Sequence, residues 1–339
     1  MSRVGITSNT VPWEILRAAG HSPQLLEQDP GPTPIADRFM EDVFDHRIRV
    51  IFDRLCSGAW SGLHMVVIPR TSEQEHKLYL YLREAARAYF PGVIPELYVY
   101  NLLHTRTPES YSYGLERTHQ MARDFAVTES ALCEAIAESN HARAVVRQIH
   151  QTRRDGLLEG SAAVELIRGF YTEARSTFAD RVSAQLDAWG VPVAGNRPRI
   201  LIKGAPLDGA SLHRVVEDSG GYVIAEDDWR GSRAAGDRDV PTDSDPVTAI
   251  FEKYFYDEMS PRVQPSSDRD AWFQREIGTG HADGVLFHIP LEDDVVGWDY
   301  PRLHAFLEAR RVPSVVVRET CALAQVAAFV GSLRQGLLV

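Results

Sequence analysis

The chain has few cysteines, no long apolar run and fewer basic than acidic residues, and each shortage excludes a class of protein. Only Cys56, Cys133 and Cys321 occur among 339 residues, too few and too scattered for a disulfide framework or a local zinc motif. No stretch approaches the roughly 18 to 20 apolar residues of a membrane-spanning helix. The 36 basic and 47 acidic residues give a formal net charge of -11, which disfavours nucleic acid and anionic membranes as partners.

The first residues and the composition set the expected compartment and size class. The opening sequence MSRVGITSNTVPWEIL has neither a sustained apolar core nor a basic leader. We therefore expect a cytoplasmic protein that binds neither a membrane nor nucleic acid. With 44% hydrophobic and 24% charged residues, the chain is long enough for two domains with separate cores.

Hydrophobic periodicity predicts two α/β lobes, at 1–110 and 196–339, joined by a helical region at 111–195. Short apolar runs separated by helical patterns predict strands at Arg3–Thr7, Gln24–Leu26, His64–Pro69, Glu96–Leu102, Arg199–Lys203, Gly221–Ala225, Gly284–His288 and Ser314–Val317. Alternation of strand and helix implies parallel sheets covered on both faces, with ligands at the carboxyl ends of the strands. We therefore expect two Rossmann- or flavodoxin-like lobes. Thr71 or Ser72 is expected to cap the helix that follows His64–Pro69.

The polar segment EDDWRGSRAAGDRDVPTDSD, at 226–245, is the most suggestive candidate for a ligand site. Asp227 and Asp228 follow a predicted strand, and Arg233 offers a planar fork that suits a phosphate or a carboxylate. The alternative is structural: Asp228 caps loop amides and pairs with Arg233. The segment KGAPLDGAS (203–211) could offer backbone amides to an anion at a helix start, although ordinary turn chemistry also explains its glycines and proline.

Histidines raise the alternative of a metal site, because twelve are present and imidazole binds metals near neutral pH. Those near predicted segment ends are His64, His76, His281 and His288. Their spacings match no zinc signature, and an isolated histidine usually has a surface or packing role. We therefore expect no metal site. Ser72 also lacks the surroundings of a hydrolase nucleophile.

Four segments in fixed order resemble a known family. They are VPWEILRAAGHSPQLLEQ (11–28), the long stretch from RILIKGAP to AAGDRDV (199–240), DGVLFHIP (283–290) and YPRLHAFLEARRVPSVVVRE (300–319). Together they resemble the 2-hydroxyglutaryl-CoA dehydratase and benzoyl-CoA reductase family. The resemblance implies an acyl-CoA thioester as substrate, an iron-sulfur cluster held by cysteines, and an enzyme of two related subunits.

The chain departs from that family where the cluster ligands would be. In PRTSEQEHKL, Ser72 stands near the expected thiolate, and no cysteine lies near His288 in LFHIPLEDD. Near the end, Gln325 and Ala327 replace an arginine and a glutamate. Because clusters are held mainly by thiolates, we expect no cofactor bound by this chain. The resemblance places a [4Fe-4S] cluster only in a partner subunit.

The resemblance also puts Glu14 near the acyl-CoA cavity. A structural alternative is sufficient by itself, because a carboxylate in the first turn of a helix at 13–19 gains roughly 0.3 to 1 kcal/mol from the helix dipole. We expect a cleft between the lobes with ligand-binding residues drawn from both, and we assign no catalytic residue. The expected ligand-binding residues are Glu14, Ser72, Asp227, Asp228, Arg233 and His288.

Two functions follow from these expectations. The first is an accessory subunit or paralogue of a 2-hydroxyacyl-CoA dehydratase or benzoyl-CoA reductase type enzyme, a lyase, which binds or acts on an acyl-CoA thioester. It would form a homodimer, or a heterodimer with a cysteine-bearing homologous subunit. The second is a cluster-free protein that binds a small acyl or carboxylate ligand, or performs non-redox acid-base chemistry in the cleft between the lobes.

Overall fold

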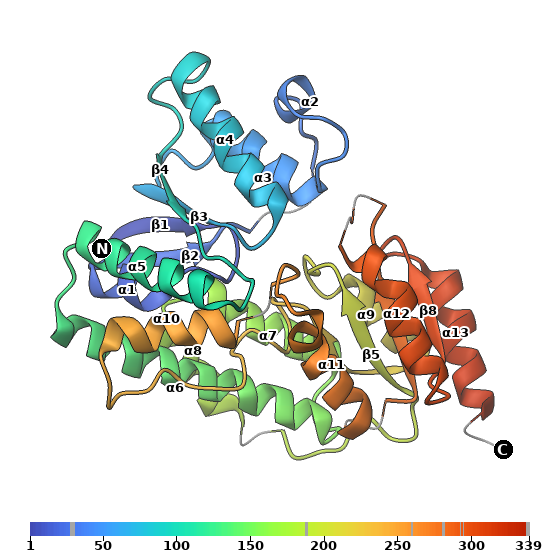
Figure 1. The fold of residues 1–339 in the computed structure, drawn as a ribbon. Helices are drawn as coiled ribbons and strands as arrows, with labels where there is room; N and C mark the ends of the chain where they lie inside the picture. Colours follow the sequence, from blue (N-terminus) through green and yellow to red (C-terminus); the bar gives the residue numbers. More distant parts are fainter. Residues whose placement is uncertain are drawn as a thin grey trace. The chain divides into compact units, whose positions relative to one another are not determined.

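The structure is a computed structural model that describes residues 1–27, 31–186, 189–258, 260–279, 282–291, 293 and 295–336. The chain divides into two compact units, each assembled from three segments (Figure 1). Unit 1 comprises Met1–His141, Tyr171–Ser176 and Asp237–Pro265, and unit 2 comprises Ala142–Phe170, Thr177–Gly236 and Ser266–Val339. The division into lobes at 1–110 and 196–339 with a connecting region at 111–195 stays a prediction.

Unit 1 contains a parallel sheet with the strand order β2-β1-β3-β4. Its inner strand β3 is rich in valine and isoleucine and is buried along its length, as expected for a strand covered on both faces. The four strands predicted for the first lobe are confirmed, with ends that shift by up to three residues. They are β1 (Ser2–Ile6), β2 (His21–Leu25), β3 (Met65–Pro69) and β4 (Glu96–Tyr100).

Four of the six helices that lie wholly in unit 1 begin at a residue whose side chain caps them. Thr107 caps α5, which has Pro108 in its first turn, and Asp245 caps α10, which begins with Pro246. Proline suits this position because the first helical N–H groups lack a partner within the helix. The helices that lie wholly in this unit are α1 (Trp13–Ala18), α2 (Ala36–Phe39), α3 (His46–Cys56), α4 (Glu73–Ala88), α5 (Pro108–Asp124) and α10 (Pro246–Tyr256).

Unit 2 contains a second parallel sheet, with the strand order β6-β5-β7-β8. Side chains alternate between its two faces: Leu201 belongs to one core cluster, and Ile200 and Ile202 belong to another. The four strands predicted for the second lobe are confirmed, which establishes two parallel-sheet lobes. They are β5 (Arg199–Gly204), β6 (Tyr222–Asp227), β7 (Gly284–His288) and β8 (Ser314–Val317).

The remaining helices cover the second sheet or connect the units. Phe273 of α11 and Leu303 of α12 belong to one core cluster of the sheet, and Leu212 of α9 and Val326 of α13 belong to the other. The helices of unit 2 are α9 (Ser211–Asp218), α11 (Ser266–Thr279), α12 (Val296–Glu308) and α13 (Leu323–Gly336). Three helices have residues in both units, namely α6 (Glu129–Arg154), α7 (Gly160–Thr172) and α8 (Arg175–Leu186).

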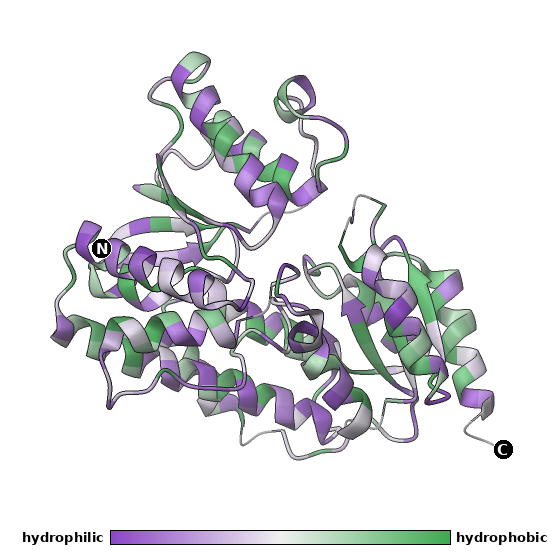
Figure 2. Cartoon of the chain, viewed as in Figure 1, coloured by the Kyte–Doolittle hydropathy of each residue, from purple (hydrophilic) through white to green (hydrophobic). Residues whose placement is uncertain are grey.

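Hydropathy follows this architecture (Figure 2). The strand β8 is drawn in green along most of its length, whereas α6 alternates between green and purple. Such alternation is typical of a helix with one apolar and one polar face. Among the described residues, no helix is both long and apolar enough to cross a membrane.

Candidate functional site

Charged side chains gather at the carboxyl edge of the second sheet. Lys203 lies at the end of β5, opposite Asp227, the last residue of β6. His288 ends β7 and lies opposite Gly204. Since the strand order changes direction between β5 and β7, this edge is the place where open α/β sheets bind ligands.

Asp227 is the centre of the charged group, because two cations bind one fully buried carboxylate. Lys203 donates from Nζ to Oδ2 at 2.5 Å, and Arg233 donates from Nη1 to Oδ1 at 2.9 Å. Burial would raise the pKa of Asp227, but the charges of Lys203 and Arg233 hold it below its usual value. The three groups therefore carry a net positive charge of one.

Arg233 is the member of this group that reaches solvent. Its side chain is 12% exposed and its guanidinium lies 5.5 Å from the ring centroid of Trp272. Within the described part of the chain, the guanidinium makes no hydrogen bond besides the one from Nη1. Its other N–H groups are therefore oriented by Asp227 and Trp272 and remain available to an oxyanion.

Asp228 has a structural role, and its ligand-binding role stays a prediction. Its Oδ1 accepts hydrogen bonds from the backbone N–H groups of Arg230, at 2.8 Å, and Gly231, at 2.7 Å. Its carboxyl is buried. Burial and the charge of Glu226 raise its pKa to about 6. The ion pair suggested for Arg233 and Asp228 is absent from the described contacts, because Arg233 pairs with Asp227.

His288 is positioned by the tight contact of β5 with β7. Its Nδ1 lies 3.3 Å from the carbonyl oxygen of Ala205, and its own carbonyl accepts the N–H of Ala205 at 3.0 Å. Gly204 has φ of +156°, and a Cβ atom there would lie 1.9 Å from the His288 carbonyl oxygen. A glycine is required at this point, so the KGAPLDGAS segment has a packing reason for Gly204.

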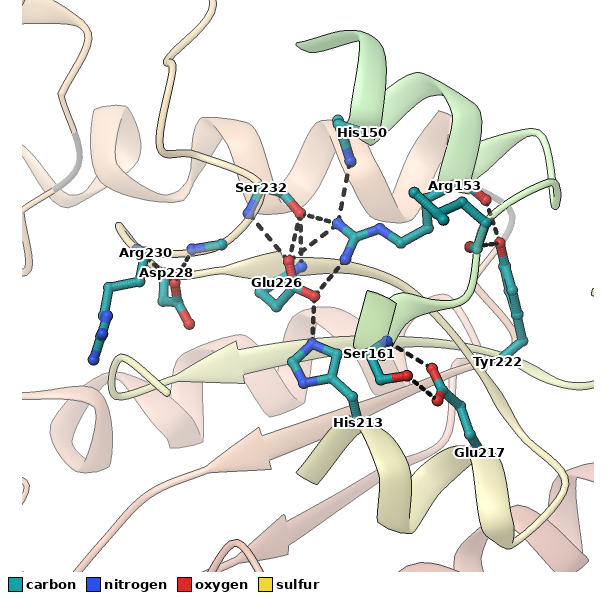
Figure 3. A network of polar contacts seen from close by, with 12 residues as sticks. His150, Arg153, Ser161, His213, Glu217, Tyr222, Glu226, Asp228, Arg230 and Ser232 are labelled. Carbon is teal, nitrogen blue, oxygen red and sulfur yellow. Dashed lines mark hydrogen bonds and ion pairs between the residues drawn. The ribbon is translucent and has the colours of Figure 1, made fainter. Parts of the chain in front are cut away.

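A buried polar network is centred on Glu226, the residue that precedes Asp227 in β6 (Figure 3). Arg153 of α6 forms two bonds to the Glu226 carboxylate, at 2.5 and 3.0 Å. His213 of α9 contacts Glu226 Oε1 through Nε2 at 2.5 Å, and the Ser232 hydroxyl donates to Oε2 at 2.8 Å. Gly231 leaves room for this carboxylate, because a Cβ there would lie 2.5 Å from Glu226 Oε2.

This network is structural, because its charged groups are sealed from solvent. Arg153, His213 and Glu226 are at most 1% exposed. Burial would raise the pKa of Glu226, but Arg153 and His213 hold it well below the usual value. The carboxylate thereby joins α6, α9 and the loop at Ser232 to one strand. It fixes the position of the next residue, Asp227.

The carboxyl edge of the first sheet carries hydroxyl groups. Thr7 follows β1 and donates to Glu75 at 2.8 Å, while the Ser8 hydroxyl lies 2.6 Å from that of Thr71, which follows β3. Thr10 also bonds to Thr71. These side chains are buried, and burial raises the pKa of Glu75. The edge also holds a cation, because Arg47 donates to the Thr7 carbonyl at 2.7 Å and lies 4.0 Å from the Glu75 carboxylate.

Ser72 caps α4. Its hydroxyl accepts the N–H of Glu75 at 3.2 Å, and the Glu75 carboxylate accepts the N–H of Ser72 at 3.1 Å. This reciprocal capping box confirms the predicted helix start at Thr71 or Ser72. The geometry gives Ser72 a structural role, and a ligand-binding role stays a prediction.

Glu14 lies in the first turn of α1, as predicted, but it is fully buried. Tyr254 of α10 donates to its Oε2 at 3.0 Å, and Arg175 lies 3.4 Å from its Oε1. The guanidinium of Arg175 also lies 4.5 Å from the ring centroid of Trp13. Glu14 thus joins residues of three helices, all three residues belonging to unit 1.

The structure unites part of the predicted site. Asp227 and Arg233 are bonded, and His288 ends a strand at the same sheet edge. Glu14 and Ser72 belong to unit 1, so a cleft shared by all of the predicted residues stays a prediction. The sequence reasoning did not single out Lys203, Glu226 or Arg153. One signal was available: consecutive acidic residues ending an apolar strand require buried partners.

The remaining histidine candidates either have local partners or lie outside the residues that the structure describes. The ring of His64 stacks on His21 with a centroid separation of 5.7 Å, and His76 lies 3.6 Å from Glu73. His281 lies outside the described residues. Over the ranges that the structure describes, no group of three or more His, Cys, Asp or Glu could hold a metal ion.

The thiols and the residues at the family's ligand positions do not fit an iron-sulfur cluster. Burial and the nearby charge of Asp53 raise the pKa of the Cys56 thiol to about 12, which opposes formation of the thiolate that a metal needs. Cys133 belongs to unit 1 and Cys321 to unit 2. Ser72 is engaged as a cap, and His288 lies against Ala205.

Comparison with known proteins gives a relative and a family. The chain is 27% identical over 182 residues to a protein of Escherichia coli strain K12 named "Putative dehydratase subunit YjiM", an alignment that covers 51% of this chain and 47% of that protein. The chain thus spans about half the length of this curated relative. The family model of the 2-hydroxyglutaryl-CoA dehydratase D-component matches residues 9–321. Because that match covers nearly the whole sequence, the chain belongs to the 2-hydroxyglutaryl-CoA dehydratase D-component family.

Proposed function

We propose that this chain is an accessory, cluster-lacking subunit of a 2-hydroxyacyl-CoA dehydratase type enzyme, and that it binds an acyl-CoA thioester in the cytoplasm. One observation carries the proposal: the unbalanced positive charge of Lys203, Asp227 and Arg233 at a sheet edge where ligands bind. Coenzyme A is a polyanion at neutral pH, so its phosphates complement this charge.

Arg233 is the residue expected to contact the ligand. One of its nitrogens is held by Asp227, and a guanidinium fixed in this way can place two parallel N–H groups against phosphate oxygens. Lys203 is 4% exposed, so it acts by balancing Asp227 while Arg233 makes the contact. Membership of a family named for a CoA-thioester dehydratase supports the same class of ligand.

A calorimetric titration with coenzyme A and acetyl-CoA tests the binding step. Arg233→Gln removes the charge and leaves Asp227 paired with Lys203. A charge-assisted hydrogen bond contributes roughly 1.5 to 3 kcal/mol, so we expect affinity to fall at least tenfold. Arg87→Gln is the matched control, because Arg87 forms an exposed ion pair with Glu84 in unit 1. Failure of the unaltered chain to saturate with either compound would remove the proposed ligand.

The accessory role concerns the cluster and the partner. We propose that a related, cysteine-bearing subunit holds the [4Fe-4S] cluster, because Ser72, His288 and the three cysteines offer no suitable thiolate set. Anaerobic purification of this chain alone should yield no stoichiometric iron. Co-expression with a cysteine-bearing homologous chain should yield a complex with absorbance near 400 nm. Four irons per isolated chain, or no complex, would contradict this role.

A second function is a cluster-free protein that binds a small acyl or carboxylate ligand. The favouring observation is geometric: a single guanidinium with unshared N–H groups matches one carboxylate. Short 2-hydroxycarboxylates, titrated into the same two variants, distinguish the functions. Saturable binding of the free acid that depends on Arg233, without binding of coenzyme A, would favour this second function.

A further inference from the structure

A second candidate site lies in unit 1, on the helices that cover one face of the first sheet. It is a pocket of about 290 Å³ between α2, α3 and α4. Nothing in the proposed function uses it. Its lining consists of Phe39, Phe52, Leu80, Tyr81, Glu84, Ala85 and Tyr89.

The walls of this pocket are held in place without a ligand. Asp53 of α3 accepts the backbone N–H groups of Ile35, at 2.6 Å, and Ala36, at 3.1 Å. Arg49 binds Asp37 at 2.5 Å. These bonds fix the short helix α2 and therefore the ring of Phe39. A preformed site binds with less loss of conformational entropy than one that must be ordered.

Aromatic rings meet edge to face around the pocket. Phe39 lies 4.9 Å from Tyr89 at an interplanar angle of 64°, and Phe52 lies 6.4 Å from Tyr81 at 88°. The fractional exposures of Leu80, at 39%, and Tyr89, at 63%, show that the pocket is open on one side. Such walls favour a flat ring, which can stack on one side chain while meeting the edge of another.

The charge of the lining decides which kind of ring the pocket suits. Glu84 is the one ionised residue among the lining side chains, and Arg87 neutralises it at 2.7 Å. The guanidinium of Arg38 lies 5.7 Å from the Phe39 ring centroid but is exposed to solvent. An ionic ligand would therefore lose water without gaining a buried counter-charge. The volume is near the lower end of ligand pockets, and seven lining residues are too few for a stable protein interface.

We propose that this pocket binds a small uncharged aromatic compound. The proposal concerns unit 1 and does not depend on Arg233 or on coenzyme A, which concern unit 2. The occupant is a single ring or a fused pair of rings. Tyr81 and Tyr89 are the lining residues that carry a hydroxyl group.

Indole is a suitable probe, with benzyltrimethylammonium and benzoate as its cationic and anionic counterparts. Ligand-detected NMR on the full chain should show saturable binding of indole. It should also show magnetisation transfer between indole and the ring protons of Tyr81 and Tyr89. Stronger binding of either charged probe would overturn the uncharged class, and no saturation with indole would overturn the site.

Substitutions at the open side of the pocket test whether indole binds there, with little risk to folding. Leu80→Ala and Tyr89→Ala change partly exposed residues, so we expect each to keep the fold and weaken indole binding at least fivefold. Leu323→Ala is the matched control, because Leu323 is 55% exposed on a helix of unit 2. Equal loss in the control, or no loss in both pocket variants, would contradict the assignment.

Discussion

At the scale of single residues, the two neighbouring carboxyls Asp227 and Asp228 show how environment sets charge. Two cations hold the pKa of Asp227 below its usual value against the effect of burial. Burial and the charge of Glu226 raise the pKa of Asp228 to about 6, and its backbone N–H bonds offset these effects only in part. The pKa values of these two adjacent aspartates are thus shifted in opposite directions. The identity of the residues alone could not predict this difference.

The raised pKa of Asp228 predicts a pH-dependent stability. The folded state holds this proton more tightly than the unfolded state, whose carboxyl has a pKa near 3.8. The contribution of Asp228 is therefore fully favourable below about pH 4 and is lost as pH rises through 6. Asp228→Asn should remove this loss, stabilising the chain at pH 8 by up to about 3 kcal/mol. Urea unfolding at pH 4, 6 and 8 measures the effect.

The control for that prediction is Asp243→Asn, since Asp243 is exposed. It should change the free energy of unfolding by less than about 0.5 kcal/mol at each pH. A stability difference between Asp228→Asn and the unaltered chain that stays constant from pH 4 to pH 8 would contradict the assignment.

Glu226 supports a second prediction at this scale. Glu226→Gln leaves Arg153 buried without its counter-charge, so we expect a loss of about 3 to 5 kcal/mol in the free energy of unfolding. Glu84→Gln breaks an exposed ion pair and should cost less than about 1 kcal/mol. Chemical denaturation compares the two variants. Equal costs would mean that the Glu226 network contributes no more than a surface pair.

At the scale of elements, the strands were predictable and the buried partners were not. Apolar runs such as MVVIP and GVLFH identify β3 and β7 because inner strands of parallel sheets are buried on both faces. Asp227 and Arg233 are six residues apart, so their proximity could be inferred from one loop. Arg153 lies 73 residues from Glu226, and no local pattern links residues at that distance.

The start of α4 gives an element-scale prediction. Ser72→Ala removes the side chain of a capping box, so it should lower the free energy of unfolding by about 1 kcal/mol. Ser72→Asp keeps a capping acceptor and should restore most of that stability. Thermal unfolding compares the variants, and acetyl-CoA binding should be unchanged in both. Loss of ligand binding in Ser72→Asp, with stability retained, would instead assign Ser72 to a ligand site.

The contact between β5 and β7 gives a second prediction at the scale of elements. Gly204→Ala brings a Cβ atom against the His288 carbonyl, whereas Gly209→Ala meets nothing within 4 Å. Both glycines have positive φ, so both variants carry strain of roughly 1 to 3 kcal/mol. Gly204→Ala should be clearly the less stable in chemical denaturation. Equal free energies of unfolding for the two variants would show that β5 and β7 can move apart without an energetic cost.

At the scale of the whole molecule, the assembly expected from the sequence stays a prediction. We expect a dimer, formed with a second copy or with a related subunit, that buries about 1,200 to 2,000 Å² of surface. Light scattering of the isolated chain should give twice the mass of one chain, or a complex should appear when a related subunit is added. A strictly monomeric particle at high concentration, with no partner recovered, would favour the small-ligand function.

The distribution of each unit over three segments has a consequence for synthesis. Unit 1 needs residues up to Pro265, which the ribosome makes after much of unit 2 has emerged. Domains usually fold as units, the N-terminal one first, while translation continues. Here α10 arrives late, and its Tyr254 bonds to Glu14 across 240 positions. The nascent chain therefore holds an incomplete unit 1 until α10 has emerged, although the core cluster between Leu26 and Leu97 is made early.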